Sequence, residues 1–357
     1  ILQRLSFVIH SLGDLKSLKK LQIFLANMTY TRSLDNATFI HPATFYISGF
    51  YNVPYAKYYY IFLCFVYVLT VLGNSFVMGV IFLARVLHTA KYIAVFNLAF
   101  SDLCGSSAVI PKYVEMFLFD KQYISYEDCL ANMFFVFFFM TLQSLTLLAL
   151  AYDRLVAICF PLRYHAVVTK TAMAVIIGVI WVFALIVFAL LVGFITRLSF
   201  CRSTTVDSYF CDHGPVYRLA CSDVSMNYIL AHVGVTSILY IPLILILVSY
   251  VCIGFALLRI SRGADRIKAM KTCTSHLILV AMFYLPIVSV YISALVTSIP
   301  PNTRIINSVL TQTIPPMLNP IIYTLKTNEI LQSFKVLYRR AKLIFAKEGS
   351  VISIVKN

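Results

Sequence analysis

The chain is poor in charged residues. Only 12% of its 357 residues are Asp, Glu, Lys or Arg, whereas soluble domains usually contain about a quarter. It also lacks a low-complexity tract, an internal repeat and a second polar domain. These absences exclude a soluble globular protein and indicate a single domain. The apolar content of 61% and the mean hydropathy of +0.87 predict an integral membrane protein instead.

Acidic residues are the scarcest charged group, and the formal net charge is +15. A basic protein can bind nucleic acid, but that requires a cationic patch on a folded polar surface. Here the cations fall between long apolar runs. The rule that cytoplasmic loops of membrane proteins are rich in Lys and Arg explains this pattern better.

Seven apolar runs are long enough to cross a bilayer, because about 20 helical residues span about 30 Å of hydrocarbon. They cover residues 58–84, 92–115, 130–153, 172–195, 227–257, 274–298 and 304–325. An odd number of crossings places the two termini on opposite sides of the membrane.

The N-terminal segment predicts which side is outside. Residues 1–27 fit a secretory signal poorly, and we interpret them as an upstream extension with Met28 as the natural start. Of the two glycosylation sequons, at Asn27 and Asn36, we expect only Asn36 to be used, which requires an extracellular N-terminus. The segments assigned to the cytosol contain 17 Lys and Arg, against five in the outer loops, which agrees with this orientation.

Cysteines divide between the predicted outer face and the membrane. Cys129 and the loop cysteines Cys201, Cys211 and Cys221 are outside, and their four thiols allow three disulfide pairings. A zinc site that uses His213 beside Cys211 is an alternative, but an oxidising exterior favours disulfides. The remaining five fall in or below the membrane and are expected to be reduced: Cys64, Cys104, Cys159, Cys252 and Cys273.

A few polar side chains lie inside the predicted spans, led by Asn74, Asp102, Gln143 and Asn319. An ionisable group in a membrane helix is costly, so Asp102 is a candidate functional residue. Interhelical hydrogen bonding that only holds the helices together is an equally weighted alternative. Paired carboxylates, a zinc-ligand cluster and inverted repeats are missing, which argues against an intramembrane enzyme or a transporter.

Four motifs occur at characteristic separations along the chain. They are Asp153-Arg154 at the end of the third span, Pro161-Leu162-Arg163-Tyr164-His165 after it, the sequence from Lys268 to Leu277, and Asn319-Pro320-Ile321-Ile322-Tyr323 in the seventh span. Together they resemble the odorant receptors, a branch of the rhodopsin-like G-protein-coupled receptors. The resemblance covers residues from about 36 to about 340.

The resemblance implies an all-α membrane protein, a seven-transmembrane helix bundle with a short amphipathic C-terminal helix in the membrane interface. The expected parts are an extracellular N-terminus at 1–57, the receptor domain at 58–325 and a cytoplasmic tail at 326–357. In that tail Ile330, Phe334, Leu337 and Tyr338 are expected to share an apolar face. The resemblance also pairs Cys129 with Cys211, which leaves Cys201 with Cys221.

The implied function is that of a plasma-membrane receptor without enzymatic activity and without a cofactor. Its partners would be a small odorant, a stimulatory heterotrimeric G protein and the lipid bilayer, with no nucleic acid and with assembly into a homo-oligomer left open. The coupling and activation residues would be Asp153, Arg154, Tyr250, Asn319, Pro320 and Tyr323. Asn74, Asp102, Gln143 and Asn319 would form the buried polar network, which in the family also holds sodium.

The ligand set implied by the resemblance is mainly apolar and suits a small molecule with one hydrogen-bonding group. It comprises Val136, Phe137, Met140 and Thr141 of the third span, Tyr284, Ile287, Val288 and Tyr291 of the sixth, and Val309, Gln312 and Thr313 of the seventh. Val136 stands where amine receptors have an aspartate, and Thr313 where opsins have a lysine. Neither anchor is therefore present. For each residue of the set, ordinary packing is an equally weighted alternative.

Departures from the family pattern indicate a divergent subfamily, for which a fish-type receptor is one candidate. Gln143 replaces a common glutamate, which puts sodium binding in doubt. Asp153-Arg154-Leu155 replaces Asp-Arg-Tyr, and Ala90-Lys91-Tyr92 replaces the common Pro-Met-Tyr. The main rival is a rhodopsin-like receptor for a lipid or peptide, and a membrane transporter is a weaker one.

Overall fold

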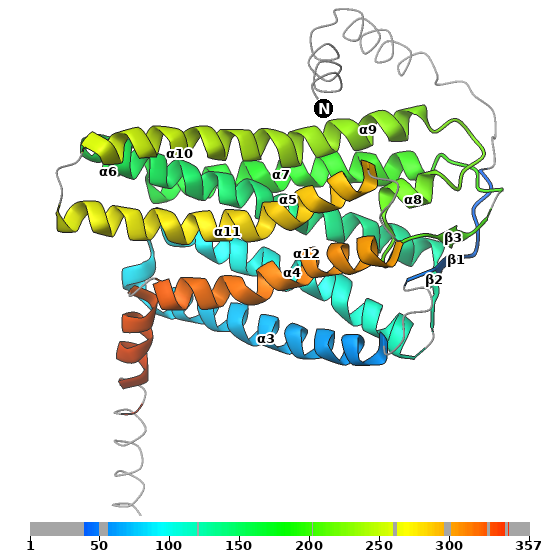
Figure 1. The fold of residues 1–357 in the computed structure, drawn as a ribbon, viewed down its shortest axis with the longest axis horizontal. Helices are drawn as coiled ribbons and strands as arrows, with labels where there is room; N and C mark the ends of the chain where they lie inside the picture. Colours follow the sequence, from blue (N-terminus) through cyan, green and yellow to red (C-terminus); the bar gives the residue numbers. More distant parts are fainter. Residues whose placement is uncertain are drawn as a thin grey trace, which may run out of the picture. The chain divides into compact units, whose positions relative to one another are not determined.

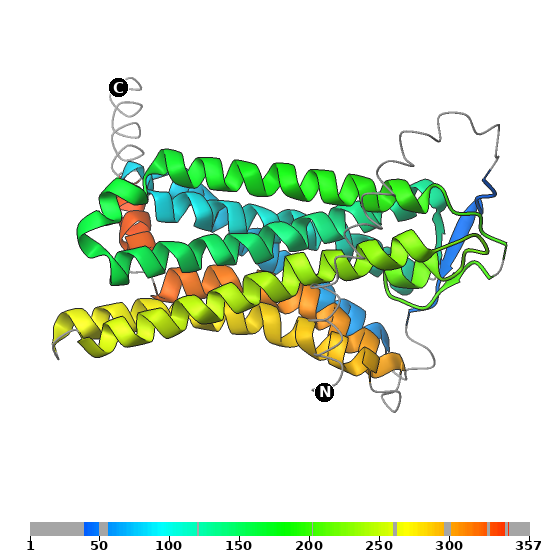
Figure 2. The same cartoon turned by 90° about the horizontal axis from the view of Figure 1, so that it is seen from above.

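A computed structural model describes residues 39–49, 56–119, 121–201, 203–259, 263–295, 301–326, 329–339 and 342. Within these residues the chain is a bundle of long helices that run side by side (Figures 1 and 2). The predicted extension at 1–27 and the sequons at Asn27 and Asn36 lie outside the described residues.

Seven long helical segments form the bundle, and each coincides with one predicted span. They are α3 (Ala56–Leu83), α4 (Ala90–Leu118), α5 (Tyr126–Cys159), α7 (Lys170–Ile195), the continuous segment α9 (Ser225–Val235), η3 (Thr236–Tyr240) and α10 (Ile241–Arg259), α11 (Ala264–Leu295) and α12 (Pro301–Lys326). The predicted seven-transmembrane helical fold is thereby confirmed.

Six of the seven segments are long and apolar enough by themselves to cross a membrane. The seventh, α12, is more polar and contains Pro315, Pro316 and Pro320. It packs against α3, α4 and α11, so its polar groups can find partners inside the protein, which is the condition for polar residues and prolines at membrane depth.

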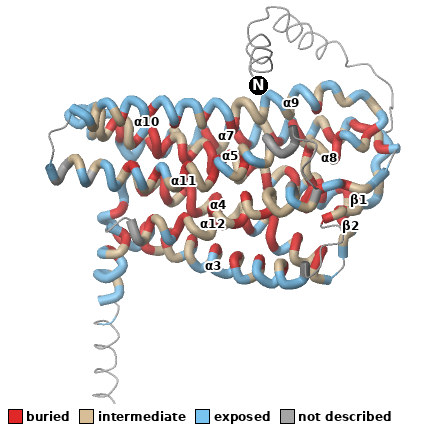
Figure 3. Tube along the Cα trace, viewed as in Figure 1, coloured by how far each residue is buried: buried red, intermediate tan, exposed pale blue. Residues whose placement is uncertain are grey.

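Burial follows the expectation for a protein surrounded by lipid. In Figure 3 the buried positions face the inside of the bundle, and the outer sides of the helices are exposed. Many exposed side chains are large and apolar, among them Phe82, Leu258 and Leu285, which are 73%, 70% and 68% exposed. A soluble protein would leave such surfaces in water, whereas here the hydrocarbon covers them.

Short elements close the two ends of the bundle. At one end a small sheet has the strand order β2-β1-β3, with β1 (Thr44–Ile47) antiparallel to β2 (Tyr123–Ser125) and parallel to β3 (Thr205–Val206). The same end contains the short helix α8 (His213–Tyr217). At the other end are η1 (Arg85–Leu87), η2 (Pro161–Arg163) and α6 (Tyr164–Val167). We call these the disulfide end and the Arg154 end, after the groups described below.

A further helix over residues 329–339 follows α12 and turns away from its axis (Figure 1). The four residues of its predicted apolar face differ in exposure. Ile330 is fully buried and Leu337 is partly buried, but Phe334 and Tyr338 are 37% and 62% exposed. Phe334 also packs against Phe76 of α3, with ring centroids 5.0 Å apart, and the shared apolar face of the four residues stays a prediction.

Candidate functional site

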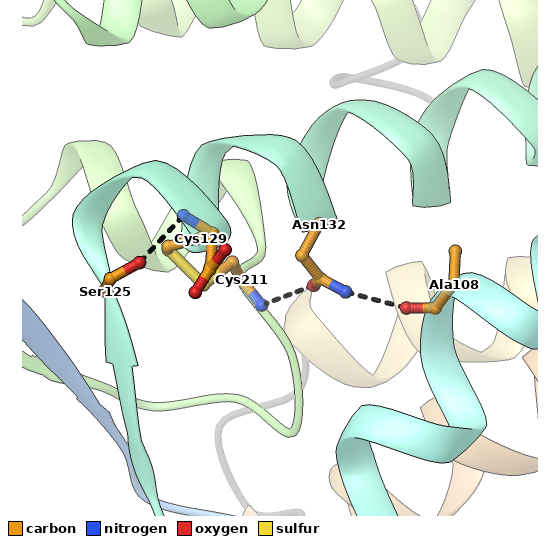
Figure 4. Close-up of a disulfide and its surroundings, with 6 residues drawn as sticks. Ala108, Ser125, Cys129, Asn132 and Cys211 are labelled. Atoms are coloured by element: carbon orange, nitrogen blue, oxygen red, sulfur yellow. Dashed lines mark hydrogen bonds between the residues drawn. A yellow bond between two sulfur atoms is a disulfide. The ribbon is translucent and has the colours of Figure 1, made fainter.

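The disulfide end is held by two disulfides, Cys129–Cys211 and Cys201–Cys221, with Cα atoms 5.3 and 5.8 Å apart. These are the pairs that the resemblance implied. Ser125 caps α5 by accepting a hydrogen bond from the backbone N–H of Asp128 at 3.1 Å (Figure 4). The cap fixes the start of the helix that carries Cys129.

Asn132 connects this disulfide to α4, a role that the sequence did not suggest. Its side-chain oxygen accepts a hydrogen bond from the backbone N–H of Cys211 at 3.3 Å, and its amide donates to the carbonyl oxygen of Ala108 at 2.8 Å (Figure 4). The loop, α5 and α4 are thus joined by one side chain. A lone Asn one turn after a cysteine gives no sequence signal of this kind.

The other five cysteines, Cys64, Cys104, Cys159, Cys252 and Cys273, form no disulfide. Among the described residues no group of three or more His, Cys, Asp or Glu side chains is placed to hold a metal ion. The zinc alternative fails at Cys211, because its sulfur is bonded to Cys129.

Two neighbouring side chains at the disulfide end are expected to respond to acid in opposite directions. Burial lowers the pKa of His213 from 6.5 to about 4. Burial also raises the pKa of Asp212 from 3.8 to about 6, although a backbone hydrogen bond from Gly214 and the charge of Arg218 act against it. Between pH 6.5 and 4 the unfolded chain binds a proton at His213 first, so stability is lost as the pH falls. Between pH 6 and 3.8 the folded protein binds one at Asp212 first, so stability is gained.

We therefore expect the melting temperature of the purified protein to change little between pH 7 and pH 5. Asp212→Asn removes the compensating gain and should melt at a lower temperature at pH 5 than at pH 7. His213→Gln should show the opposite trend. Differential scanning fluorimetry in one detergent checks this, and an identical pH dependence in all three proteins would contradict it.

The candidate ligand residues of α5 and α12 lie in the interior of the bundle. Val136, Thr141, Val309 and Thr313 are buried, whereas Phe137, Met140 and Gln312 are partly buried. The Gln312 amide lies 3.6 Å from the sulfur of Met140, which brings the two helices together at this level.

The hydroxyls of the two threonines in the predicted ligand set donate hydrogen bonds within their own helices. Thr141 donates to the carbonyl oxygen of Phe137 at 2.8 Å, and Thr313 to that of Val309 at 2.9 Å. Each bond runs one turn back along the same helix, the usual arrangement for a buried Thr. Among these side chains Gln312 remains the better hydrogen-bonding group for a ligand.

Aromatic side chains that sequence spacing did not indicate complete this region. The Phe137 ring packs against Phe188 of α7 at 6.0 Å and against Phe210 of the disulfide-bonded loop at 5.9 Å. Next to Phe210, the Tyr209 hydroxyl donates to the carbonyl oxygen of Ser308 at 3.0 Å. The loop therefore lies over the candidate ligand residues and is tied to α12.

The α11 members of the ligand set are placed differently from one another. Ile287 is buried and Val288 partly buried, while the side chain of Tyr291 lies outside the described residues. The Tyr284 hydroxyl is 2.8 Å from the Ser144 hydroxyl, which also donates to the carbonyl oxygen of Ile238 at 2.5 Å. Ile238 lies in the π-helical turn η3, a turn that disturbs the regular backbone ladder and often marks functional sites. Ser144 of α5 is thus the junction that connects Tyr284 of α11 to η3.

Three of the four residues predicted for the polar network meet at Asp102, which is only 1% exposed. Its two carboxylate oxygens accept hydrogen bonds from the Gln143 amide at 3.0 Å and from the Asn319 amide at 2.7 Å. The three residues come from α4, α5 and α12. A buried carboxylate is expensive unless donors surround it, and these two amides supply them.

Asn74 serves the proline motif of α12 and does not contact Asp102 by a hydrogen bond. Pro320 has no N–H, so the carbonyl oxygen of Pro316 lacks its helical donor. The Asn74 amide supplies that donor at 2.9 Å. Gly73 allows the approach, because a Cβ atom there would lie 3.0 Å from Pro320. The Gly-Asn pair of α3 is therefore matched to Pro320 across the bundle.

At the Arg154 end, Asp153 is fully buried and its carboxylate lies 3.6 Å from the guanidinium of Arg154. The other carboxylate oxygen accepts a hydrogen bond from the Tyr164 hydroxyl at 2.9 Å. The Arg154 side chain is 15% exposed. Arg154 is accordingly held near the surface by an acid that is itself fixed in place.

Tyr250 and Tyr323, the two predicted coupling tyrosines, are differently engaged. The Tyr250 hydroxyl is 2.8 Å from Nδ1 of His276, whose Nε2 lies 3.1 Å from the carbonyl oxygen of Leu147. His276 therefore connects α10 and α11 to α5. Tyr323 is buried, and its hydroxyl has no hydrogen-bond partner among the described residues.

Comparison with known proteins gives consistent matches. A family model described as "Olfactory receptor" matches residues 63–340. Olfactory receptor 1J1 of Mus musculus is 35% identical over 286 residues, which cover 79% of this chain and 89% of the relative. Olfactory receptor 1 of Rattus norvegicus and olfactory receptor 2A12 of Homo sapiens are each 34% identical, over 78% of this chain and 88% and 89% of the respective relatives.

Proposed function

Because this chain belongs to the olfactory receptor family, we propose that it binds a small, mainly apolar odorant within the helix bundle and activates a stimulatory G protein that raises cyclic AMP. As a member of this family it is a multi-pass plasma-membrane receptor and not an enzyme. The proposal includes the orientation, with residues 1–57 outside, Asn36 glycosylated, 58–325 as the receptor domain and 326–357 in the cytosol.

The observation that carries the proposal is the arrangement along α5. Cys129, near its start, is tied to the loop that lies over the candidate ligand residues, and Arg154 lies 25 residues further on. That separation corresponds to about 37 Å of helix, so one element reaches from the ligand region to the Arg154 end. A receptor must couple two such sites.

The hydrogen bonds between helices suggest how the coupling works. Tyr284 joins α11 to Ser144 of α5 beside the ligand residues, and His276 joins α11 to α5 again nearer to Arg154. A ligand that favours a different position of Tyr284 would displace α11 relative to α5. The population shifts only by the difference in the ligand's affinity for the two arrangements.

Arg154 is the proposed contact for the G protein. In the structure it is close to Asp153, but Asp153 retains the Tyr164 hydroxyl as a second partner. When Arg154 moves away, the buried carboxylate of Asp153 therefore still has one hydrogen-bond donor, the Tyr164 hydroxyl. An arginine at this position offers several N–H donors to a docking segment.

The test is to express the full chain with a stimulatory olfactory G protein and to record cyclic AMP with a panel of small alcohols, aldehydes, acids, steroids and amines. Arg154→Ala should lower the response by about 30-fold or more, the equivalent of losing a desolvated charged contact. Arg163→Ala is the matched control, because Arg163 is exposed in η2, just after α5. This variant should signal normally.

Cell-surface staining must be equal in all variants for the comparison to hold. A wild-type response that survives Arg154→Ala would contradict the coupling proposal. A receptor that reaches the surface and answers no member of the panel would contradict the odorant class proposed.

A further inference from the structure

A second cation lies at the Arg154 end and forms an ion pair across the bundle. The ammonium of Lys91, in the first turn of α4, is 3.3 Å from the carboxylate of Glu329, the first described residue after α12. The Tyr92 hydroxyl donates a hydrogen bond to the same carboxylate oxygen. The Lys91 ammonium also lies 4.7 Å from the centre of the Tyr92 ring.

The two ends of this ion pair differ in accessibility. The side chain of Glu329 is 62% exposed, whereas that of Lys91 is 20% exposed and is supported by Tyr92. An ion pair with a largely exposed member contributes little to stability, because water and salt compete for the charges. Glu329 is therefore an exchangeable partner, while Lys91 stays in position.

Lys91 and Arg154 lie near enough to each other for their charges to interact. Lys91 interacts electrostatically with both Arg154 and Asp153, and Glu329 also interacts with Arg154. The acid beside Arg154 is fully buried and bonded to Tyr164. Of Asp153 and Glu329, the exposed Glu329 is the one that can leave by a simple side-chain rotation into solvent.

We propose that Lys91 is a second docking cation for the G protein, binding a carboxylate of the segment that docks at Arg154 after displacing Glu329. The inference rests on the proposed function and adds the chemistry of the partner, an acidic group within reach of Arg154. Charge complementarity of this kind acts mainly on the strength and rate of docking. Glu329 then competes with the partner and restrains docking.

Lys91→Met removes the positive charge and keeps an unbranched side chain of similar length, so it should leave surface expression unchanged. Glu329→Gln keeps a carbonyl oxygen for the Tyr92 hydroxyl and removes only the charge. The two variants are matched, and the proposal gives them opposite signs.

The experiment uses the full-length receptor in lipid nanodiscs and measures ligand-free nucleotide exchange on the purified stimulatory G protein as its concentration is varied. Lys91→Met should raise the half-maximal G-protein concentration by about threefold to tenfold and leave the maximal rate unchanged. Glu329→Gln should lower that concentration by a similar factor. Both differences should shrink at high salt.

A charge swap separates docking from a structural role. Lys91→Glu combined with Glu329→Lys rebuilds the internal ion pair but presents the wrong charge to the partner. The swap should therefore couple more weakly than wild type at every G-protein concentration. Wild-type coupling in the swap, or equal coupling in Lys91→Met and Glu329→Gln, would overturn the proposal.

Arg154→Ala, measured in the same assay, distinguishes failure of the Lys91 proposal from failure of the proposed coupling function. If Arg154→Ala abolishes exchange while the Lys91 and Glu329 variants match wild type, the second cation is wrong and the coupling function stands. If wild-type exchange does not depend on Arg154, both are wrong.

Discussion

Replacing both Cys129 and Cys211 with serine is expected to remove most of the correctly folded receptor from the cell surface. The disulfide joins residues that are 82 positions apart. In the chain-entropy description, a cross-link over that separation restrains the unfolded chain by about 4.5 kcal/mol, which is a large fraction of a typical folding stability. Membrane insertion already restricts the unfolded chain, so this figure is an upper bound.

Loss of this disulfide also releases the loop from the ligand region. Cys211 follows Tyr209 and Phe210, which contact Ser308 and Phe137 respectively. Asn132 would lose its contact with the backbone of Cys211 as that segment moved. Whatever receptor does reach the surface should therefore respond poorly to any active odorant.

The second disulfide supplies the matched control. Cys201 and Cys221 are separated by 20 positions, for which the same description predicts about 3.3 kcal/mol, and their removal leaves Cys211 bonded to α5. Flow cytometry of intact cells should show clearly more surface receptor for the Cys201→Ser/Cys221→Ser variant. Equal surface amounts in the two variants would contradict the assigned importance of the Cys129–Cys211 link.

Gln143→Glu is expected to make the stability of the receptor depend strongly on sodium. In the wild-type protein Gln143 donates a hydrogen bond to Asp102, and a glutamate would replace that donor with a second carboxylate at about the same position. Two buried carboxylates in contact repel each other unless a proton or a cation lies between them. Asn319 alone cannot compensate, because its amide already donates to the other oxygen of Asp102.

Without sodium the variant should lose roughly 3 kcal/mol, the cost of an uncompensated buried charge, and melt about 5–10 °C lower. Sodium chloride should restore much of that loss, whereas choline chloride should not. Gln143→Met is the control, because it removes the donor without adding a charge, and its melting temperature should not depend on sodium. The wild-type protein should behave like the control, and a strong sodium effect in it would show that Gln143 does not prevent binding.

Local patterns were enough for the fold. The length of each apolar run and the charge between runs predicted seven spans, and seven helical segments are observed. Spacing along α5 also placed Cys129 and Arg154 at opposite ends of one helix. These are properties of a segment and its solvent, since a helix in lipid satisfies its own backbone hydrogen bonds.

The same kind of reasoning was weaker for side-chain contacts. It grouped Ile330, Phe334 and Tyr338 on one face, but it did not indicate that Ile330 would be buried while Phe334 and Tyr338 are more exposed. It placed Thr141 and Thr313 in the ligand set, but it did not indicate that both hydroxyls donate within their own helices. Helical periodicity indicates which residues lie on the same face of a helix. It does not indicate whether that face packs against protein, lipid or water.

The sequence by itself determined the membrane class, the number of helices and the family, because hydropathy and contiguous motifs are encoded along the chain. Tertiary structure alone decided that Asn74 satisfies the carbonyl freed by Pro320, that Ser144 joins Tyr284 to the π-helical turn, and that Lys91 meets Glu329. In each case a polar group finds its partner on another helix, up to 242 residues away in the chain. In low-dielectric surroundings a polar group without a hydrogen-bond partner costs free energy, so such pairs form. Which groups pair depends on how the helices pack, and a local sequence pattern does not specify this.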